Sequence, residues 1–357
     1  MKKVAILVPT MNRIDFVIRL IHYYVSIDAK HPIFIGDASS ESSEELVLKA
    51  AQNKLEVFYY HWEKLNDRKT MVELAKKAHL VNITDYCVFS GDDDFFIEKS
   101  LSQCAEFLDE NIEFATSQGR AFRFKLNKDG PYGQLLIIDV YWDVKELNGV
   151  TALERLNEIT SDYWVPNFSV HRIEEFIEDI GNGIDTIIDR DFGEYSNSLT
   201  MAMRGKSKFI DCLYLARNVH SSIDHPTRAE WMKSENWKLS YIELVKSVSK
   251  VLSQNDNLSK EESNLNAEMA VDILTKPQFN RDNSILVLIR KTIKDRFIDK
   301  RGFISRLYLL YRNLKKILSN IFPSKGFSRK SLLSPKSEYY KDVCSIIDAC
   351  KKGSNIN

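Results

Sequence analysis

The stretch YCVFSGDDDFF, Tyr86 to Phe96, joins a short apolar run to three consecutive aspartates. The apolar run is typical of a buried strand in a parallel sheet. Adjacent carboxylates repel one another unless a cation lies between them, and open α/β sheets bind ligands at the carboxyl ends of their strands. The stretch therefore indicates a divalent-metal site for a phosphorylated ligand, and a solvated acidic turn is the alternative.

Strand and helix patterns alternate on both sides of this stretch. Apolar runs predict strands at 4–8, 33–35, 55–61 and 86–89, a strand pair within 115–126, and strands at 135–140 and 209–215. Helical periodicity predicts helices at 14–27, 44–52, 69–80, 97–108, 151–159 and 196–203. This alternation predicts an α/β fold, a doubly wound and mostly parallel sheet with helices on both faces.

Polar residues follow three of the predicted strands. They are Pro9, Thr10, Asn12 and Arg13 after the first strand, Asp37 and Ser39 after the second, and Asp92, Asp93 and Asp94 after the fourth. Parallel strands bring these three loops to one edge of the sheet. Neither a GxGxxG nor a GxxxxGK[ST] pattern occurs, so the sequence supports neither a dinucleotide fold nor a P-loop.

Composition limits the class of protein. The net charge over 357 residues is zero, which gives no indication of nucleic-acid binding. The five cysteines form no CxxC pair, which suits a reducing cytosol, and neither a signal peptide nor a long apolar span is recognisable. We expect a cytoplasmic protein.

The polar loops, taken together with two later motifs, resemble those of nucleotide-sugar glycosyltransferases with the GT-A fold, close to the family-2-like bacterial group. The resemblance covers residues 1 to about 222. It rests on the loop after the first strand, the Asp-x-Ser pair, the Asp-x-Asp-like triplet, a Phe-Gly-Glu-Tyr motif and a late histidine, which are Pro9–Arg13, Asp37 with Ser39, Asp92–Asp94, Phe192–Tyr195 and His220. The family's usual acidic pair is here Gly193-Glu194.

The resemblance implies a role for each motif. The first loop and Asp37 with Ser39 would hold the nucleotide. Asp92 and Asp94 would bind Mn²⁺ or Mg²⁺, with Asp93 and Asp94 as the alternative pair, and His220 would complete the metal shell, with His225 as a rival. Glu194, or less readily Asp191, would be the catalytic base of an inverting transfer.

Two further groups are predicted to bind the donor sugar nucleotide. Arg68 and Lys69 stand at a helix N-terminus, which attracts phosphate, although solvated surface charges would look the same. The aromatic stretch 162–168 is either core or a stacking wall for a sugar ring.

The resemblance implies a GT-A catalytic domain at 1–225, and the change in sequence character from Pro226 onward predicts a helical extension at 226–357. Residues 290–330 of the extension hold 13 Lys/Arg with interleaved apolar residues, which predicts either a helix on an anionic membrane surface, the inner face of the plasma membrane, or a helix packed on the catalytic domain.

The sequence thus predicts a metal-dependent, inverting glycosyltransferase of bacterial surface polysaccharide biosynthesis, such as capsule or O-antigen. A UDP-sugar is the expected donor and a glycan or lipid-linked glycan the expected acceptor. A nucleotidyltransferase is a weaker alternative because the first loop lacks a glycine run. A catalytically inactive GT-A scaffold is the other.

Overall fold

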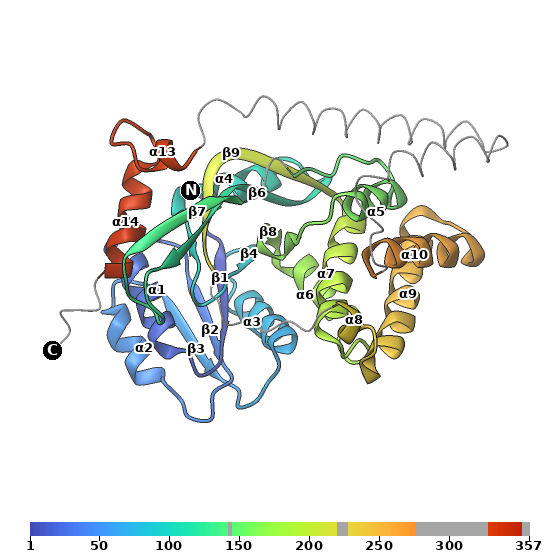
Figure 1. Cartoon of the computed structure of the whole chain (residues 1–357), viewed down its shortest axis with the longest axis horizontal. Coiled ribbons are helices and arrows are strands. Elements are labelled where there is room, and N and C mark those ends of the chain that lie inside the picture. Colours follow the sequence, from blue (N-terminus) through green and yellow to red (C-terminus); the bar gives the residue numbers. More distant parts are fainter. Residues whose placement is uncertain (142–144, 220–227, 276–327, 352–357) are drawn as a thin grey trace.

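The computed structural model is an α/β protein with one central sheet (Figure 1). It describes residues 1–141, 145–219, 228–275 and 328–351. The strands are β1 (Ala5–Thr10), β2 (Ile33–Asp37), β3 (Val57–His61), β4 (Tyr86–Phe89), β5 (Phe95–Phe96), β6 (Phe114–Leu126), β7 (Leu135–Tyr141), β8 (Val170–Arg172) and β9 (Lys206–Asn218). Within these residues the sheet order is β3-β2-β1-β4-β8-β6-β9-β5, and β7 pairs with β6.

The helices cover both faces of this sheet. They are α1 (Ile14–Ser26), α2 (Glu44–Ala51), α3 (Asp67–Val81), α4 (Glu98–Glu110), α5 (Ala152–Ser161), the 3₁₀ turn η1 (Pro166–Phe168), α6 (Ile173–Gly181), α7 (Arg190–Arg204), α8 (Arg228–Trp231), α9 (Glu235–Asp256), α10 (Lys260–Thr275), α13 (Arg329–Leu332) and α14 (Tyr340–Lys351). Apolar residues of α1, α2, α4 and α14 pack on one face, and those of α3 and α6 pack on the other. The predicted fold class is confirmed.

The N-terminal strands β3-β2-β1-β4 form a continuous parallel part of the sheet. Its strands are short and mostly apolar, and β1 and β2 are buried along almost their whole length. In the β1–β2 register Thr10 faces Asp37, so the first two polar loops leave the sheet side by side. The third loop leaves β4, the other neighbour of β1.

The second half of the sheet differs from the prediction in three elements, because β5 and β8 were not predicted and a predicted strand pair is a single strand. The predicted strand pair at 115–126 is the single strand β6, which runs parallel to β9 and antiparallel to β7 and β8. Because β5 pairs antiparallel with the end of β9, Phe95 faces Ala216. This pairing brings the last residues of β9 directly to the acidic triplet.

Helix α7 begins earlier than its apolar period predicts. Asp189 is its N-cap and accepts a hydrogen bond from the Phe192 backbone N–H at 3.0 Å. A carboxylate at this position satisfies a donor that the helix leaves unpaired, so the helix starts at Arg190 instead of 196. Glu194 therefore lies on the helix itself, one turn after its start.

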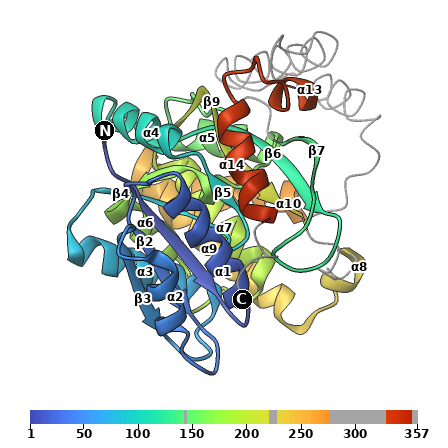
Figure 2. The ribbon, with the colours of Figure 1, turned by 90° about the vertical axis from the view of Figure 1, so that its left-hand side faces the viewer.

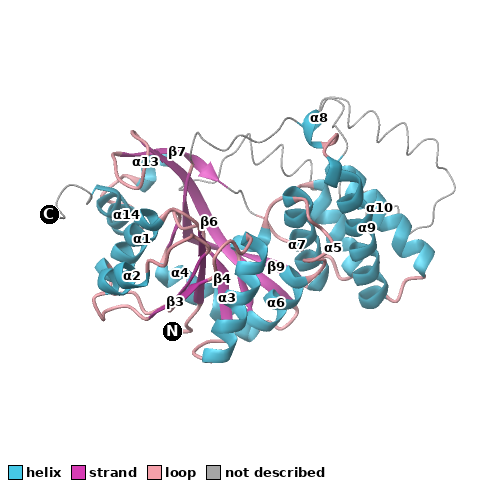
Figure 3. Ribbon diagram, turned by 90° about the horizontal axis from the view of Figure 1, so that it is seen from below, coloured by secondary structure: helices cyan, strands magenta, loops and turns pink. Residues whose placement is uncertain are grey.

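A second core is formed by α5, α7, α9 and α10, beside the sheet (Figure 3). It contains Leu156 of α5, Leu199 of α7, Val248 of α9 and Val271 of α10, all fully buried. The predicted boundary between 225 and 226 thus does not separate two cores, because helices from both sides of it bury their apolar faces against each other.

The C-terminal helix returns to the N-terminal half of the chain. Figure 2 shows α14 alongside α1, and its buried residues Val343 and Ile346 belong to the same core as β1 and α1. Of the basic segment predicted at 290–330, residues 290–327 lie outside the described part. Among the helices that are described, none combines the length and apolarity needed to cross a membrane.

Candidate functional site

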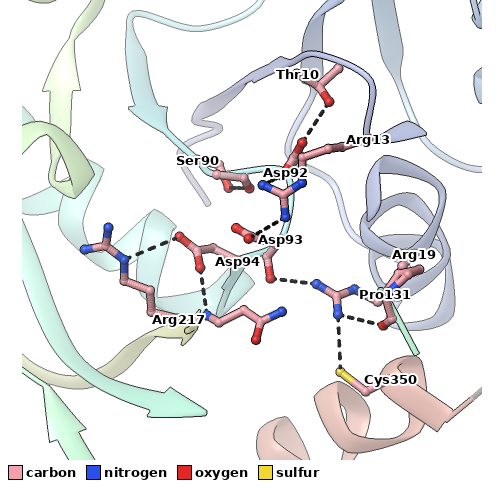
Figure 4. Close-up of polar contacts among 12 residues, drawn as sticks. Thr10, Arg13, Arg19, Ser90, Asp92, Asp93, Asp94, Pro131, Arg217 and Cys350 are labelled. Carbon is pink, nitrogen blue, oxygen red and sulfur yellow. Dashed lines mark hydrogen bonds and ion pairs between the residues drawn. The ribbon is translucent and has the colours of Figure 1, made fainter. Parts of the chain in front are cut away.

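The acidic triplet is held by the loop after β1. Thr10 donates a hydrogen bond through Oγ1 to Asp92 Oδ2 at 2.8 Å. The guanidinium of Arg13 contacts Asp92 Oδ1 at 3.1 Å and Asp93 Oδ2 at 2.8 Å (Figure 4). Opposite charges at these distances offset much of the repulsion among the carboxylates. The prediction that the first and third loops lie side by side is therefore confirmed.

Asp94 faces the end of β9. Its Oδ1 accepts a hydrogen bond from the Asn218 backbone N–H at 2.9 Å, and its Oδ2 lies 4.0 Å from Arg217 Nε. Burial, together with the charge of Asp93, raises the pKa of Asp94 to about 8. The same causes raise the pKa of Asp92 to about 6, although Arg13 and Thr10 act in the opposite direction. A nearby cation would stabilise the ionised form of both carboxyl groups.

A cleft of about 1120 Å³ opens in front of Asp93 and Asp94. Its walls come from the triplet, the start of α3, the loop before α7, the first turns of α7, the β6–β7 turn and the end of β9. Among the residues that line it are Arg13, Phe16, Arg68, Lys69, Gly91, Asp93, Asp94, Asp129, Val165, Asn167, Phe168, Asp185, Asp191, Glu194, Arg217 and Asn218. Its volume suits a ligand larger than a typical drug molecule.

Two carboxylates of the triplet face the same space beside Gly91. A Cβ atom at Gly91 would lie 2.9 Å from Asp93 Oδ1 and 3.1 Å from Asp94 Oδ2, so both oxygens face the room that this glycine leaves. Mg²⁺ and Mn²⁺ prefer such oxygen ligands. No group of three His, Cys, Asp or Glu side chains within the described ranges is arranged as a metal site. A bound cation would thus need ligand phosphate oxygens to complete its shell, as is usual for Mg²⁺.

Asp92 points away from this space and does not line the cleft. Its two oxygens are engaged by Thr10 and Arg13. The geometry therefore fits the Asp93/Asp94 pair better than the Asp92/Asp94 pair. The predicted histidine ligand cannot be placed, since His220 and its rival His225 lie outside the described residues.

The Asp-x-Ser loop forms a separate hydrogen-bonded group beside the triplet. Asp37 accepts from the Ser39 backbone N–H at 2.9 Å and from the Tyr59 hydroxyl at 2.6 Å. Ser39 Oγ in turn accepts from the Asn12 backbone N–H at 2.8 Å, with Asn12 in a left-handed conformation at φ 57°. The first and second loops are thus joined as predicted. Pro9, Thr10, Asn12, Asp37 and Ser39 do not line the main cleft.

Arg68 does not have the contacts of a phosphate ligand. Its guanidinium donates to the backbone oxygens of Ile180, Asn182 and Ile187 and to Asn197 Oδ1, each at 3.2 to 3.3 Å. It is only 9% exposed, so it is not a solvated surface charge either. Arg68 instead fixes α3 to the loop that precedes α7.

Lys69 differs from its neighbour. It is partly exposed, lines the cleft and pairs with Asp185 at 2.8 Å. An exposed pair of this kind contributes little to stability, so the ammonium group remains able to meet a phosphate.

Glu194 projects from α7 into the cleft and is open to solvent. Its Oε1 accepts a hydrogen bond from the Tyr163 hydroxyl at 3.0 Å, and that hydroxyl lies 3.1 Å from Ser198 Oγ. Partial burial on the cleft wall raises the pKa of Glu194, with Asp191 adding to the shift. A carboxylate with a raised pKa and a fixed orientation is suited to accept a proton. Asp191 lines the same cleft as the second predicted candidate.

Gly193 leaves room beside α7 for the side chain of Arg68. A Cβ atom at this position would lie 2.9 Å from Arg68 Cδ. The buried stem of Arg68 thus occupies the space that a side chain at 193 would need.

Two site residues, Arg217 and Asn218, were not predicted from the sequence. Arg217 lies 4.4 Å above the Phe168 ring, next to Asp94, and Asn218 binds Asp94 through its backbone. The strand-end rule that selected the triplet would also have selected these two, since they end β9. Of the aromatic stretch, Phe168 is a core residue that also lines the cleft, and Trp164 is buried in the second core, so the core part of the prediction is confirmed.

Comparison with known proteins shows likeness in structure and not in sequence. No family model and no curated protein matches this chain. A structure of S. aureus TarS residues 1–349 in complex with UDP-GlcNAc aligns with 98% of this chain and 89% of that one, at a TM-score of 0.50 and 14% identity.

Two other TarS structures align less closely. One in complex with UDP covers 79% of this chain and 75% of that one, at a TM-score of 0.48 and 15% identity. A TarS structure with a longer chain has a TM-score of 0.48 and 16% identity over 79% of this chain, which spans 45% of that one. At such identities the likeness concerns the fold alone, and that fold is of the GT-A type.

Proposed function

We propose that this chain is a glycosyltransferase that moves a sugar from a nucleotide-sugar donor to an acceptor hydroxyl. The observation that carries the proposal is the single cleft onto which Asp93 and Asp94 face from the sheet and Glu194 faces from α7. A phosphate anchor and a base that line one cleft are what a transfer between two substrates requires. The fold is also that of TarS, a glycosyltransferase whose solved structures include complexes with UDP and UDP-GlcNAc.

In this proposal the donor diphosphate lies between the triplet and the cationic groups around it. Asp93 and Asp94 would hold Mn²⁺ or Mg²⁺, which supplies Lewis-acid stabilisation of the departing diphosphate. Arg13, Lys69 and Arg217 line the same cleft. Their positive charges would also stabilise the negative charge of the departing diphosphate. The loop of Asn12, Asp37 and Ser39 would contact the nucleoside.

Glu194 would be the general base. It takes the proton of the acceptor hydroxyl as the acceptor oxygen forms a bond to the anomeric carbon. The bond between that carbon and the diphosphate oxygen breaks in the same step, and the nucleoside diphosphate leaves with the electron pair. Direct attack of this kind inverts the anomeric centre. A UDP-sugar as donor, and a glycan or lipid-linked glycan of the bacterial surface as acceptor, complete the proposal.

Ligand-induced thermal shifts with UDP-, GDP- and CMP-sugars, with and without Mn²⁺, test this proposal. We expect one donor class to raise Tm, more strongly with Mn²⁺, and to be cleaved in the presence of the acceptor. Asp94→Asn should remove the metal-dependent part of the shift. Asp211→Asn is the matched control, since Asp211 is an exposed partner of Arg120 on the same strand as Arg217.

The outcomes separate the alternatives. No shift with any nucleotide sugar would contradict the proposal and favour an inactive scaffold. Pyrophosphate release from a nucleoside triphosphate and a sugar phosphate would indicate a nucleotidyltransferase instead.

The finer proposal of a membrane contact rests on the sequence of residues 290–330, with its 13 basic side chains. Sedimentation of the full chain with liposomes, with and without anionic lipid, tests it. Binding that requires anionic lipid and weakens with salt is expected. An absence of binding at low salt would contradict it.

A further inference from the structure

Arg19 is a fully buried arginine on a helix whose buried face is otherwise apolar. It has 0% exposure and lies on α1 between Val17 and Leu20, which are buried too. A buried guanidinium carries a large desolvation cost unless its N–H groups are bound. That cost lowers the pKa of Arg19, and the nearby triplet carboxylates act in the opposite direction. The contacts that offset this desolvation cost indicate the structural role of Arg19.

Those contacts join three segments that are far apart in the chain (Figure 4). Arg19 donates to the backbone oxygen of Asp93 at 2.7 Å and to that of Pro131, in the β6–β7 turn, at 2.7 Å. It also lies 4.0 Å from Cys350 Sγ, in the last turn of α14. The backbone N–H of Gly133 donates to the Cys350 backbone oxygen at 2.9 Å, so the turn and the helix are bound to each other as well.

Two of these segments form walls of the cleft. Asp93 and Asp94 line it from the triplet, and Asp129 and Gly130 line it from the β6–β7 turn. Arg19 does not line the cleft itself. By binding the backbone of Asp93 from behind, it leaves the Asp93 carboxylate directed to the cleft, where Oδ2 meets Arg13.

Aromatic rings fix the position of the guanidinium. Its central carbon lies 4.9 Å from the ring centre of Phe95 and 5.2 Å from that of Phe16. Phe95 directly follows the triplet, and Phe16 lines the cleft. A cation between two such faces is further stabilised, so its donors are held in fixed directions.

We propose that Arg19 is a positioning residue that fixes the acidic triplet to the β6–β7 turn, with α14 as the support behind both. The helix α14, outside the region of family resemblance, thereby becomes part of the framework of the cleft. The statement that this framework serves donor binding rests on the proposed function. The mechanical coupling among the three segments does not.

Hydrogen exchange of the full-length protein tests the coupling without any ligand. In Arg19→Met, whose side chain keeps much of the volume but has no donors, amides of residues 91–95 and 129–133 should exchange about tenfold faster than in the wild type. Arg172→Met is the matched control, because Arg172 also donates to two backbone oxygens, those of Phe114 and Leu108, but does not line or adjoin the cleft. It should leave exchange in both segments unchanged.

Donor affinity provides the second readout. With the nucleotide sugar that shifts the wild type most, Arg19→Met should raise Kd about tenfold, while Arg172→Met leaves Kd unchanged even if both lower Tm. Arg19→Lys keeps the positive charge, but its ammonium group lacks the rigid plane from which a guanidinium donates in two directions. The Kd of Arg19→Lys should therefore lie between those of Arg19→Met and the wild type. Arg19→Lys also serves as the test variant if Arg19→Met does not fold.

Unchanged exchange at 91–95 and 129–133 in the Arg19 variants, or equal acceleration in Arg172→Met, would overturn the proposal. Altered exchange with unaltered Kd would overturn its donor-binding part. If the wild type binds no nucleotide sugar, the proposed function fails, and the exchange data still decide the role of Arg19.

Discussion

At the scale of single residues, the carboxylates that line the cleft lie in different environments. Glu194 is open to solvent and oriented by Tyr163, whereas Asp94 is buried and bound to the end of β9. Environments that separate carboxylates in this way are typical of sites that divide roles between ligand binding and proton transfer.

Glu194→Gln should lower the rate of transfer without weakening donor binding. The amide keeps the shape of the side chain and can still meet the Tyr163 hydroxyl, but it cannot take a proton from the acceptor. A loss of about 10²–10⁴-fold in kcat is expected, with donor Kd unchanged. Glu261→Gln, at an exposed position in the first turn of α10, is the control. Wild-type kcat in Glu194→Gln would exclude Glu194 as the base and turn attention to Asp191.

Tyr163→Phe tests whether the base is oriented by its neighbour. The variant removes the hydroxyl that donates to Glu194 Oε1 and leaves the ring in its packing against Tyr195. Because that hydrogen bond lowers the pKa of Glu194, its loss should move the acidic limb of the kcat profile to higher pH. A pH–rate profile that matches the wild type would contradict this.

The free protein should lose stability as pH rises through neutrality. The pKa of Asp94 is about 8 in the folded state, while an unfolded aspartate has a pKa of about 3.9. Between these values the folded state binds more protons than the unfolded state, so the free energy of unfolding falls with rising pH, by about 1.4 kcal/mol per unit at most.

Asp94→Asn should remove this part of the slope. Urea unfolding from pH 5 to 9 of the wild type and the variant measures it, and Mn²⁺ should flatten the wild-type slope by favouring the charged carboxylate. Identical slopes in the two proteins would show that Asp94 ionises normally.

At the scale of elements, the contact between α3 and α7 sets the position of the base. Arg68 reaches from α3 across the loop before α7 and passes directly over Gly193. The absence of a side chain at 193 therefore allows the close approach on which the direction of Glu194 depends.

Gly193→Ala should be destabilising although alanine is the better helix former. The added methyl would lie 2.9 Å from Arg68 Cδ, and a shift of that stem would strain four hydrogen bonds at a cost of about 1–3 kcal/mol. Gly181→Ala is the matched control, since nothing lies within 4 Å of a Cβ there. Urea unfolding should find Gly181→Ala as stable as the wild type or slightly more so. Equal stability of the two variants would contradict the contact.

At the scale of the whole molecule, two cores support the cleft. The sheet core includes α14 from the far end of the chain, and the helical core joins α5 and α7 to α9 and α10. The walls of the cleft come from both, so its shape depends on segments on either side of residues 276–327.

Ile346→Ala should destabilise the whole sheet core. Ile346 is fully buried on α14, and truncation of such a side chain costs about 2–5 kcal/mol. Leu333→Ala, at a position that is 42% exposed, should cost about 0.5 kcal/mol or less. Thermal unfolding measures both. A small effect of Ile346→Ala would mean that α14 is dispensable for the core.

The local patterns of the sequence sufficed for the parallel half of the sheet and for its polar edge. Strands β1 to β4, helices α1 to α4 and the meeting of Thr10, Asp37 and Asp92 follow from apolar period and strand order. These signals are local or follow from the handedness of strand–helix–strand units, so they need no knowledge of distant contacts.

Tertiary structure alone decided the rest. The direction of Asp92 away from the cleft, the arrival of Arg217 and Asn218 at Asp94, the burial of Arg68 and Arg19, and the return of α14 all depend on segments 70 or more residues apart meeting in space. Sequence period records which face of an element is apolar, but not which partner covers it. A charged residue on the buried face of an element looks the same in the sequence whether its side chain binds a phosphate or a backbone carbonyl. Only the folded structure distinguishes the two.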